Sequence, residues 1–154
     1  MTPMVIIDYI AGFIDGDGCF SVHKRKPSMA SREKSPSYRP KLHIVNTNRK
    51  VLEIFKSFFN CGNISILKKV KSNWKTCYNY EISGKQFFPI LEILVNHLIV
   101  KKPVAEKILQ YKVYFTNAYG RGNQYSGKQT LPQNVLQKRE KLYKLCKKLN
   151  KKGI

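Results

Sequence analysis

The chain is organised around Tyr9-Ile-Ala-Gly-Phe-Ile-Asp-Gly-Asp-Gly18, an apolar segment that ends in two acids set among glycines. Helical spacing divides this segment and the residues before it into two faces. The bulky face should enter the core of its own chain and consists of Ile7, Ile10, Ala11 and Ile14. The other face has two positions without side chains, so another helix can approach it closely. It consists of Tyr9, Gly12, Phe13 and Gly16.

We expect this helix to cover about residues 6–17 and to end between Gly16 and Gly18, because glycine favours helix C-termini. Asp17 then lies at the negative end of the helix dipole, where an acid is unfavourable. A bound cation would reverse that penalty. Asp-Gly pairs are also common turn formers, so the last four residues alone fit an ordinary turn as well.

The nonapeptide Ile10–Gly18 resembles the LAGLIDADG motif of homing endonucleases, with Ile for the first Leu, Phe for the second Leu and Gly for the second Ala. The resemblance is close to the single-motif, homodimeric members. It implies an α+β fold of order αββαββα, with a saddle-shaped antiparallel sheet, helices on one face and further helices at about residues 131–150. We expect residues 1–154 to form a single domain of this type.

The charge of the chain predicts a polyanionic partner. Lys and Arg number 29 against 9 Asp and Glu, a formal net charge of +20, and nucleic acid is the simplest partner for it. A merely soluble basic surface, a ribosomal protein or a binder of anionic membranes would fit the charge alone. No apolar run is long enough for a transmembrane helix, and residues 1–15 lack the features of a signal peptide.

The four cysteines, Cys19, Cys61, Cys77 and Cys146, are scattered and stand at no metal-binding spacing with a histidine. We expect reduced thiols, no zinc site and, without a Gly-rich phosphate loop, no nucleotide cofactor. An intracellular location is expected. The Lys-, Asn-, Ile- and Tyr-rich composition favours a chloroplast or mitochondrion, with archaeal or bacterial cytoplasm as the alternative.

Periodicity predicts two strand pairs alternating with helices. Strands are expected at residues 19–25, 38–46, 63–70 and 75–83, with a long Pro-containing loop from residue 26. Helices are expected from Thr47 or Asn48 to Phe59, with Gly62 as the C′ residue, and over residues 86–97, where Pro89 must lie in the first turn or bend the helix. Two more should run from Pro103 to about residue 116 and, after a loop at 118–126, from a capping box at Thr130.

Two hairpins with helices on one side leave the other sheet face open, as in an α+β sandwich. The side chains expected on that face are polar or basic. They are Ser21, His23, Arg25, Lys41, His43, Asn79 and Glu81. We expect this face to bind the DNA major groove, which admits a two-stranded ribbon.

Phosphodiester hydrolysis requires a metal ion, a positioned water and a cation near the transition state. Asp17 and the carbonyl of Gly16 offer hard oxygen ligands suited to Mg²⁺. One acid binds a divalent cation weakly, whereas two copies of Asp17 brought together by packed motif helices would bind it better. One motif per chain therefore predicts a two-fold homodimer and a roughly palindromic target.

The resemblance implies further site residues. Asp17 corresponds to the metal-binding acid, Asn46 to the solvent-organising Gln or Asn at the end of the second strand, and Lys50 to a basic residue shortly after it. Lys101 corresponds to the active-site lysine, although the adjacent Lys102 leaves this register open. From the residues alone, Asn46 fits a turn or cap and the lysines fit solvated charges. Asp15 is expected to have a structural bonding role.

The function implied is a sequence-specific, intron-encoded homing endonuclease that makes a staggered double-strand cut in a long pseudo-palindromic DNA site. Mg²⁺ is the expected cofactor, with Mn²⁺ able to substitute and Ca²⁺ able to bind without supporting cleavage. Two alternatives stay open. One is an RNA-binding intron maturase on the same fold, and the other is a DNA-binding protein that does not cleave.

Overall fold

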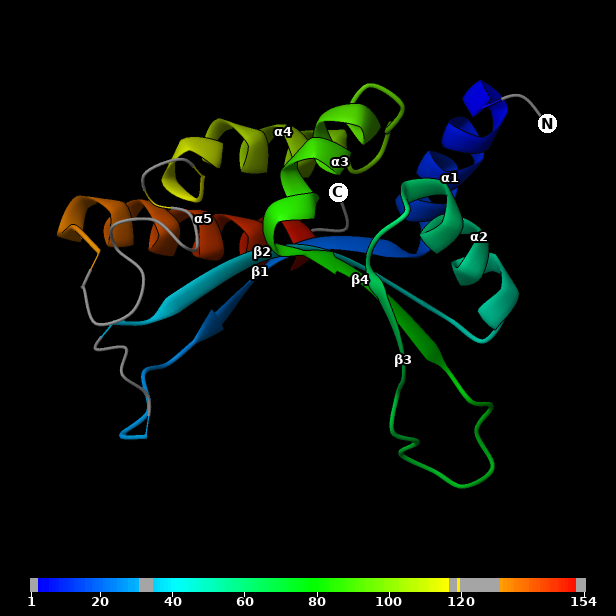
Figure 1. Ribbon diagram of the computed structural model, residues 1–154. Coiled ribbons are helices and arrows are strands. Elements are labelled where there is room, and N and C mark those ends of the chain that lie inside the picture. The colour runs from blue at the N-terminus through cyan, green and yellow to red at the C-terminus, as the bar shows by residue number, and fades with distance from the viewer. Residues whose placement is uncertain (1–2, 31–34, 117–118, 120–130, 152–154) are drawn as a thin grey trace.

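The computed structural model describes residues 3–30, 35–116, 119 and 131–151. The elements follow the expected order αββαββα and continue into two further helices (Figure 1). They are α1 (Pro3–Asp17), β1 (Gly18–Arg25), β2 (Ser37–Asn46), α2 (Arg49–Phe59), β3 (Asn63–Ile66), β4 (Tyr78–Ser83), α3 (Phe87–Leu94), α4 (Lys102–Gln110) and α5 (Gln133–Lys151), with 3₁₀ turns at Gly84–Gln86 and Lys112–Tyr114.

The four strands form one antiparallel sheet in the order β1-β2-β4-β3. Its two hairpins splay apart like the flaps of a saddle, and all the helices lie on the same side (Figure 1). None of the helices in the described ranges lies on the opposite, concave face of the sheet (Figure 1). The predicted fold class is therefore confirmed.

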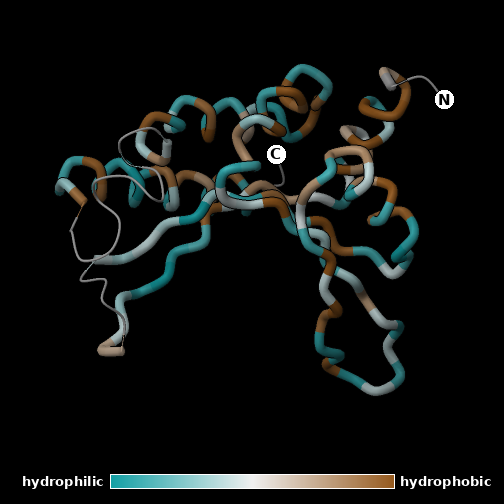
Figure 2. The backbone as a smooth tube through the Cα atoms, viewed as in Figure 1, coloured by the Kyte–Doolittle hydropathy of each residue, from teal (hydrophilic) through white to brown (hydrophobic). Residues whose placement is uncertain are grey.

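Strand alternation places the core between the sheet and the helices. One side of the sheet contributes fully buried apolar side chains, namely Phe20, Leu42, Ile44, Tyr80 and Ile82. The bulky face of α1 meets them, since Ile10, Ala11 and Ile14 are completely buried. Figure 2 shows that hydrophilic residues run along the outer half of β1.

Helix α5 covers the β1–β2 hairpin from the helical side. Its buried Leu142 and Cys146 face the core, and the Asn150 side chain donates a 3.0 Å hydrogen bond to the carbonyl of Phe20. Buried Arg139 ties α5 to the preceding segment, because its Nε donates to the carbonyl of Tyr114 at 2.8 Å. Burial lowers the pKa of Arg139 to about 10.

A cluster around Glu140 fixes the same hairpin to α5. Its carboxylate accepts a 2.7 Å hydrogen bond from Lys24 and another from the Tyr38 hydroxyl. The Lys24 ammonium also lies 5.6 Å from the ring centre of Tyr143. The hydrogen bond from Lys24 and the one from Tyr38 lower the pKa of Glu140.

Several element boundaries differ from the sequence expectation. Helix α1 begins at Pro3 rather than at about residue 6, and α3 ends at Leu94 rather than at residue 97. The second hairpin is shorter than predicted, since β3 ends at Ile66 and β4 begins at Tyr78. Only the hydrogen bond from Leu67 N–H to the Cys77 carbonyl, at 2.9 Å, extends the ladder further. The helix predicted to reach residue 116 ends at Gln110 and is followed by a 3₁₀ turn.

The predicted cap residues are partly corrected. Asn48 caps α2 as expected, with its side-chain oxygen accepting from the N–H of Lys50 at 3.1 Å. At the other end, Asn60 rather than Gly62 is the left-handed cap, with φ of 50°. Gly62 also has a positive φ, 84°, and its missing Cβ would lie 2.5 Å from the ring of Tyr80. Glycine is thus required there by close packing against β4.

Helix α3 starts at Phe87 and keeps Pro89 in its first turn, as predicted. The expected loop at 118–126 and the capping box at Thr130 lie outside the described residues, apart from residue 119. No helix of the described chain is both long and apolar enough to cross a membrane.

Candidate active site and nucleic-acid interface

Helix α1 delivers Asp17 to the edge of the concave face. Asp17 is its last residue and is exposed, and β1 begins at the next position. A Cβ on Gly18 would lie 2.9 Å from the backbone and side chain of Ile14. This close approach explains the glycine. The helix ends at Asp17, between Gly16 and Gly18 as predicted, although neither glycine has a positive φ.

Asn46 joins the end of β2 to Asp17. Its side-chain nitrogen donates to Asp17 Oδ2 at 3.4 Å, and its side-chain oxygen accepts from the N–H of Asn48 at 2.8 Å. The second bond makes Asn46 a turn residue of the kind that Asn often forms. The structure therefore combines both interpretations: the amide is held by a local turn and lies beside the motif acid.

Asp15 connects α1 to the segment before α4. Its carboxylate accepts hydrogen bonds from three successive backbone N–H groups, those of Ile99, Val100 and Lys101, at 2.7, 3.1 and 2.8 Å. The Lys101 ammonium donates to the Asp15 carbonyl at 2.5 Å. Asp15 thus makes the structural bonds that were expected of it.

The contacts of Asp15 distinguish the two lysines that the sequence left open, because they involve Lys101 and not Lys102. Lys101 is the N-cap residue of α4 and reaches the last turn of α1. Its charge is also felt by the half-buried Cys19 thiol, whose pKa burial raises while Lys101 and Lys41 act in the opposite direction. Both ammonium groups therefore lie near enough to Cys19, two residues after Asp17, for their charges to act on its thiol.

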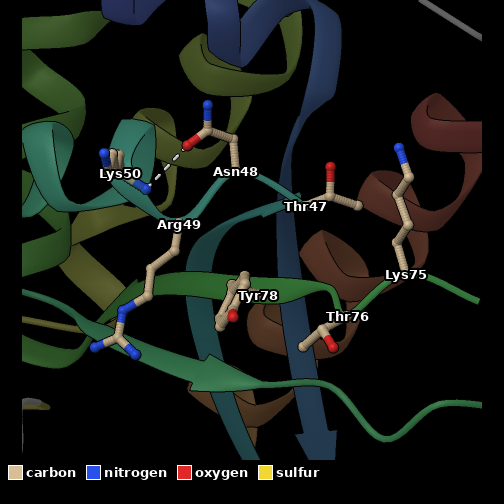
Figure 3. Close-up of a pocket in the computed structure, with 7 residues that line it drawn as sticks. All are labelled: Thr47, Asn48, Arg49, Lys50, Lys75, Thr76 and Tyr78. Atoms are coloured by element: carbon tan, nitrogen blue, oxygen red, sulfur yellow. Dashed lines mark hydrogen bonds between the residues drawn. The ribbon is translucent and has the colours of Figure 1, made fainter.

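Lys50 is placed differently. Within the described residues, its ammonium makes no hydrogen bond or ion pair with Asp17 or Asn46. Lys50 lies in the first turn of α2, at the rim of an open groove of about 560 Å³. Figure 3 shows the Lys50 and Arg49 side chains diverging from this turn.

The groove itself is basic and hydroxyl-rich. Its lining residues are Thr47, Asn48, Arg49, Lys50, Lys75, Thr76 and Tyr78. The Arg49 guanidinium lies 5.8 Å from the Tyr78 ring centre and 2.8 Å from the Glu53 carboxylate. Sequence reasoning missed Arg49 and Lys75 as candidate nucleic-acid contacts. The register of the β3–β4 hairpin, which the sequence does not give, is what brings Lys75 opposite α2.

On the concave face, strand register arranges the predicted contact residues in rows across the sheet. Cα partners pair His23 with Arg39, Ser21 with Lys41 and Ser83, His43 with Glu81 and Asn63, and Val45 with Asn79 and Ser65. All seven residues predicted for this face fit the pattern. They are Ser21, His23, Arg25, Lys41, His43, Asn79 and Glu81. Arg39, Asn63 and Ser65 were not predicted and join them.

Two polar atoms in the middle of this face have no hydrogen-bond partner in the described structure, His43 Nδ1 and Asn79 Oδ1. Burial, and then the charge of Lys41, lowers the pKa of His43, so its ring is neutral at neutral pH. Lys41 and Glu81 are paired at 3.0 Å. Neutral and paired polar groups of this kind suit the reading of base edges better than simple attraction of phosphate.

The outer face of α1 is apolar and largely uncovered. Met4, Val5 and Tyr9 are exposed, and a Cβ on Gly12 or Gly16 would meet nothing within 4 Å. Exposed contiguous apolar surface is typical of protein contacts. Phe13 is the exception among the predicted interface residues, because its ring packs at 5.1 Å against Phe55 of the same chain.

The segment that binds Asp15 adds to this apolar surface. Ile99 is 83% exposed and Val100 is 49% exposed, although both are tied by their backbone to α1. Sequence reasoning missed these two positions, because they lie far along the chain in a segment without periodicity.

The donor set of one chain fits Mg²⁺ only with outside ligands. The described residues contain no group of three or more His, Cys, Asp or Glu side chains placed to hold a metal ion. Mg²⁺ commonly keeps several waters and binds one or two carboxylates together with substrate phosphates. The exposed Asp17 carboxylate and the Gly16 carbonyl fit that mode of binding.

Comparisons with known proteins agree with one another. A sequence model described as LAGLIDADG endonuclease matches residues 10–119, and no curated protein matches the chain. The solved structures found include I-CvuI with the I-CreI target (TM-score 0.72, 19% identity, covering 96% of this chain and 83% of that one). The archaeal intron-encoded I-Vdi141I, complexed with DNA, is similar (0.72, 23%, 96% and 86%). I-TnaI aligns over 100% of this chain and 99% of its own, with a TM-score of 0.60 and 19% identity.

Proposed function

Because the chain belongs to the LAGLIDADG endonuclease family, we propose that it is a homodimeric, divalent-metal-dependent DNA endonuclease that cuts both strands of a specific site. The observation that carries the proposal is the position of Asp17. The motif acid stands exposed at the end of α1, hydrogen-bonded to Asn46, where the uncovered polar face of the sheet begins. Among the residues that the structure describes, this acid has no structural partner that would explain its place, apart from the 3.4 Å hydrogen bond from Asn46.

The concave sheet face is the DNA-binding surface in this proposal. Rows of polar side chains, unsatisfied atoms at its centre and a net charge of +20 are the properties that major-groove recognition needs. The basic groove around Arg49 and Lys75 would contact the phosphate backbone beside it. The related I-Vdi141I and I-CvuI were both solved bound to DNA, which supports this use of the shared fold.

The outer face of α1 supports the proposal of a homodimer. The open glycines allow two copies of α1 to cross closely, as in small-residue helix pairs, and the exposed Met4, Val5 and Tyr9 gain cover. Both copies of Asp17 then approach the two-fold axis. This arrangement predicts a pseudo-palindromic target with a staggered cut across its centre, because each protomer acts on one strand.

Asp17 and the Gly16 carbonyl would hold the metal ion, with Mg²⁺ or Mn²⁺ active and Ca²⁺ bound but inactive. The metal would supply a polarised phosphate and an activated water. Asn46 is suited to orient that water, since its amide already lies beside Asp17. Lys101 would stabilise the negative charge on the phosphate, and Lys50 would bind a nearby phosphate at the groove. I-CvuI complexes prepared with 2 mM Mg and with 2 mM Ca support divalent-metal use.

A mobile intron in an organelle, archaeal or bacterial genome is the proposed setting of the gene. In that setting, cleavage of alleles that lack the intron would promote its spread. The archaeal relative is intron-encoded, which is consistent with this origin.

The test is selection of cleaved and bound duplexes from a randomised library with Mg²⁺, comparing the wild type with Asp17→Asn. The expected result is a near-palindromic site that the wild type cuts and the variant only binds. Cutting by both proteins would move the metal site away from Asp17. Specific binding without cutting by either would support the non-cleaving DNA-binding protein. Binding of structured intron RNA but of no duplex DNA would support the maturase.

A further inference from the structure

The segment between α3 and α4 closes around the Asp15 carboxylate. Ile99 and Val100 donate their backbone N–H groups to Oδ2, at 2.7 and 3.1 Å, and Lys101 donates its own to Oδ1 at 2.8 Å. Successive peptide N–H groups that converge in this way form a concave anion site. Both oxygens of Asp15 are therefore committed to the backbone of residues 99–101.

The side chain of Lys101 is held by the same residue. Its ammonium donates to the main-chain carbonyl of Asp15 at 2.5 Å. The last carbonyls of a helix have no partner within the helix, and a cation near them is favourable. Backbone and side chain of Lys101 are thus both fixed to a point two residues before Asp17.

Packing holds the start of this segment, where Leu98 is buried, but not the two positions after it. Ile99 and Val100 are 83% and 49% exposed, so few apolar contacts oppose movement there. A second tie between α1 and the end of α3 already exists, because Asp8 lies 2.6 Å from His97. The Asp8–His97 contact already attaches this segment to α1, so the particular effect of Asp15 is to fix Lys101 near the end of α1.

We infer that Asp15 is a positioning residue, which sets the Lys101 ammonium against the end of α1 so that it meets the phosphate held by Asp17. The inference rests on the proposed function, since it assigns Lys101 a part in cleavage. In the protein without DNA, the Asp15 carbonyl accepts a hydrogen bond from the Lys101 ammonium. A phosphate oxygen would take the place of that carbonyl as the acceptor when DNA binds.

The experiment is a double-mutant cycle of Asp15→Asn and Lys101→Met, measured by single-turnover cleavage and, separately, by duplex binding. Asn keeps the size of Asp but replaces one acceptor with a donor, which faces a backbone N–H. We expect Asp15→Asn to slow cleavage on the order of 100-fold, as small misplacements of reacting groups do, with duplex affinity unchanged. In the Lys101→Met background, the same substitution should cost little more.

Asp8→Asn is the matched control. It removes the same charge from the same helix and weakens the contact with His97, which follows α3, but it does not touch Lys101. We expect a smaller drop in melting temperature, because this pair is exposed, and no change in cleavage rate. Amide hydrogen exchange at residues 99–101 should accelerate in Asp15→Asn and stay slow in Asp8→Asn.

An equal rate penalty for Asp15→Asn with and without the Lys101 ammonium would overturn the inference, because it would show a role that does not pass through Lys101. An unchanged cleavage rate in Asp15→Asn would overturn it too. Failure of the proposed function is recognised separately, since the wild type would then bind duplex DNA without cutting it. The inference about Lys101 would fall with that function.

Discussion

At the scale of single residues, the three glycines of the motif have different tasks. Gly12 and Gly16 face open space, whereas Gly18 lies so close to Ile14 that a Cβ would be 2.9 Å from its backbone. Gly18 is therefore constrained by packing inside the protomer, whereas Gly12 and Gly16 leave room for another molecule on the helix face. Only the role of Gly12 and Gly16 depends on a partner molecule.

Substitution of Gly18 by Ala should destabilise the fold by about 1–3 kcal/mol, the usual cost of forcing atoms into a packed site. Urea unfolding at a protein concentration low enough to keep the chain monomeric measures the change. Gly16→Ala serves as the control, because its new methyl group meets nothing within the protomer. Equal stability of the two variants would show that Ile14 yields without cost.

His43 should make stability depend on pH in a defined direction. Because burial lowers its pKa in the folded state, the unfolded chain takes up the proton first as the pH falls. The stabilisation is complete above the ordinary pKa of about 6.5 and is lost as the pH falls through the lowered value. His43→Gln should flatten this limb in urea unfolding between pH 5 and 8. A parallel slope in the two proteins would exclude His43 as the source.

At the scale of secondary structure, periodic patterns predicted most elements. They failed where the end of an element depends on whether another element packs against it. The alternation in β1, β2 and β4 and the two faces of α1 are local properties of the sequence, so they could be read directly. The ends of the β3–β4 hairpin could not, because residues 67–77 lack a helix to pack on and their apolar members gain nothing from alternation. Val70 and Trp74, for example, are 80% and 52% exposed.

The cluster at Glu140 should govern the attachment of the β1–β2 hairpin to α5. Hydrogen bonds from Lys24 and Tyr38 lower the pKa of Glu140, so its contribution is present above the ordinary value of 4.5 and is lost as the pH falls through the folded value. Glu140→Gln should flatten the acid limb of stability and speed amide exchange in β1.

Glu53→Gln is the control for this comparison, since Glu53 pairs only with Arg49 on an exposed helix surface and such pairs contribute little. An equal effect of the two substitutions on exchange in β1 would contradict the role of the Glu140 cluster.

At the scale of the whole molecule, the candidate site combines what sequence could and could not supply. Asp17 and the metal-binding role proposed for it came from the motif and the family resemblance, and the open sheet face came from alternation and charge. Arg49, Lys75 and the exposed Ile99 and Val100 depend on how distant segments are brought together. No local pattern marks them.

DNA binding should weaken steeply with salt. Each neutralised phosphate contributes a slope of about −0.9 to log K against log salt concentration, and the basic groove and sheet face offer several such contacts. Fluorescence anisotropy with a short duplex measures the slope. The double variant Arg49→Gln and Lys75→Gln should reduce it by about 2. Lys148→Gln and Lys151→Gln, at the C-terminal end of α5 on the helical side of the sheet, should leave it unchanged. Salt-independent binding would refute a nucleic-acid partner altogether.

The oligomeric state should depend on the outer face of α1. A bulky side chain at Gly12 has room in the protomer but would hold two motif helices apart, so Gly12→Leu should sediment as a monomer and lose cleavage while keeping its melting profile at low concentration. Ile93→Gln, on an exposed apolar residue of α3, is the control. A dimeric Gly12→Leu protein would place the interface elsewhere.

The row arrangement of the concave face has a consequence for how such a protein changes its target over time. Successive rows are two residues apart along the strands, about 6.7 Å, and base pairs rise about 3.4 Å each, so one row spans roughly two steps of the duplex. Under the proposed mode of DNA binding, each row would contact its own pair of base steps. A mutation in the His43 row would change the preference at those base pairs and leave the neighbouring ones unaffected, so target specificity could evolve by a few base pairs at a time.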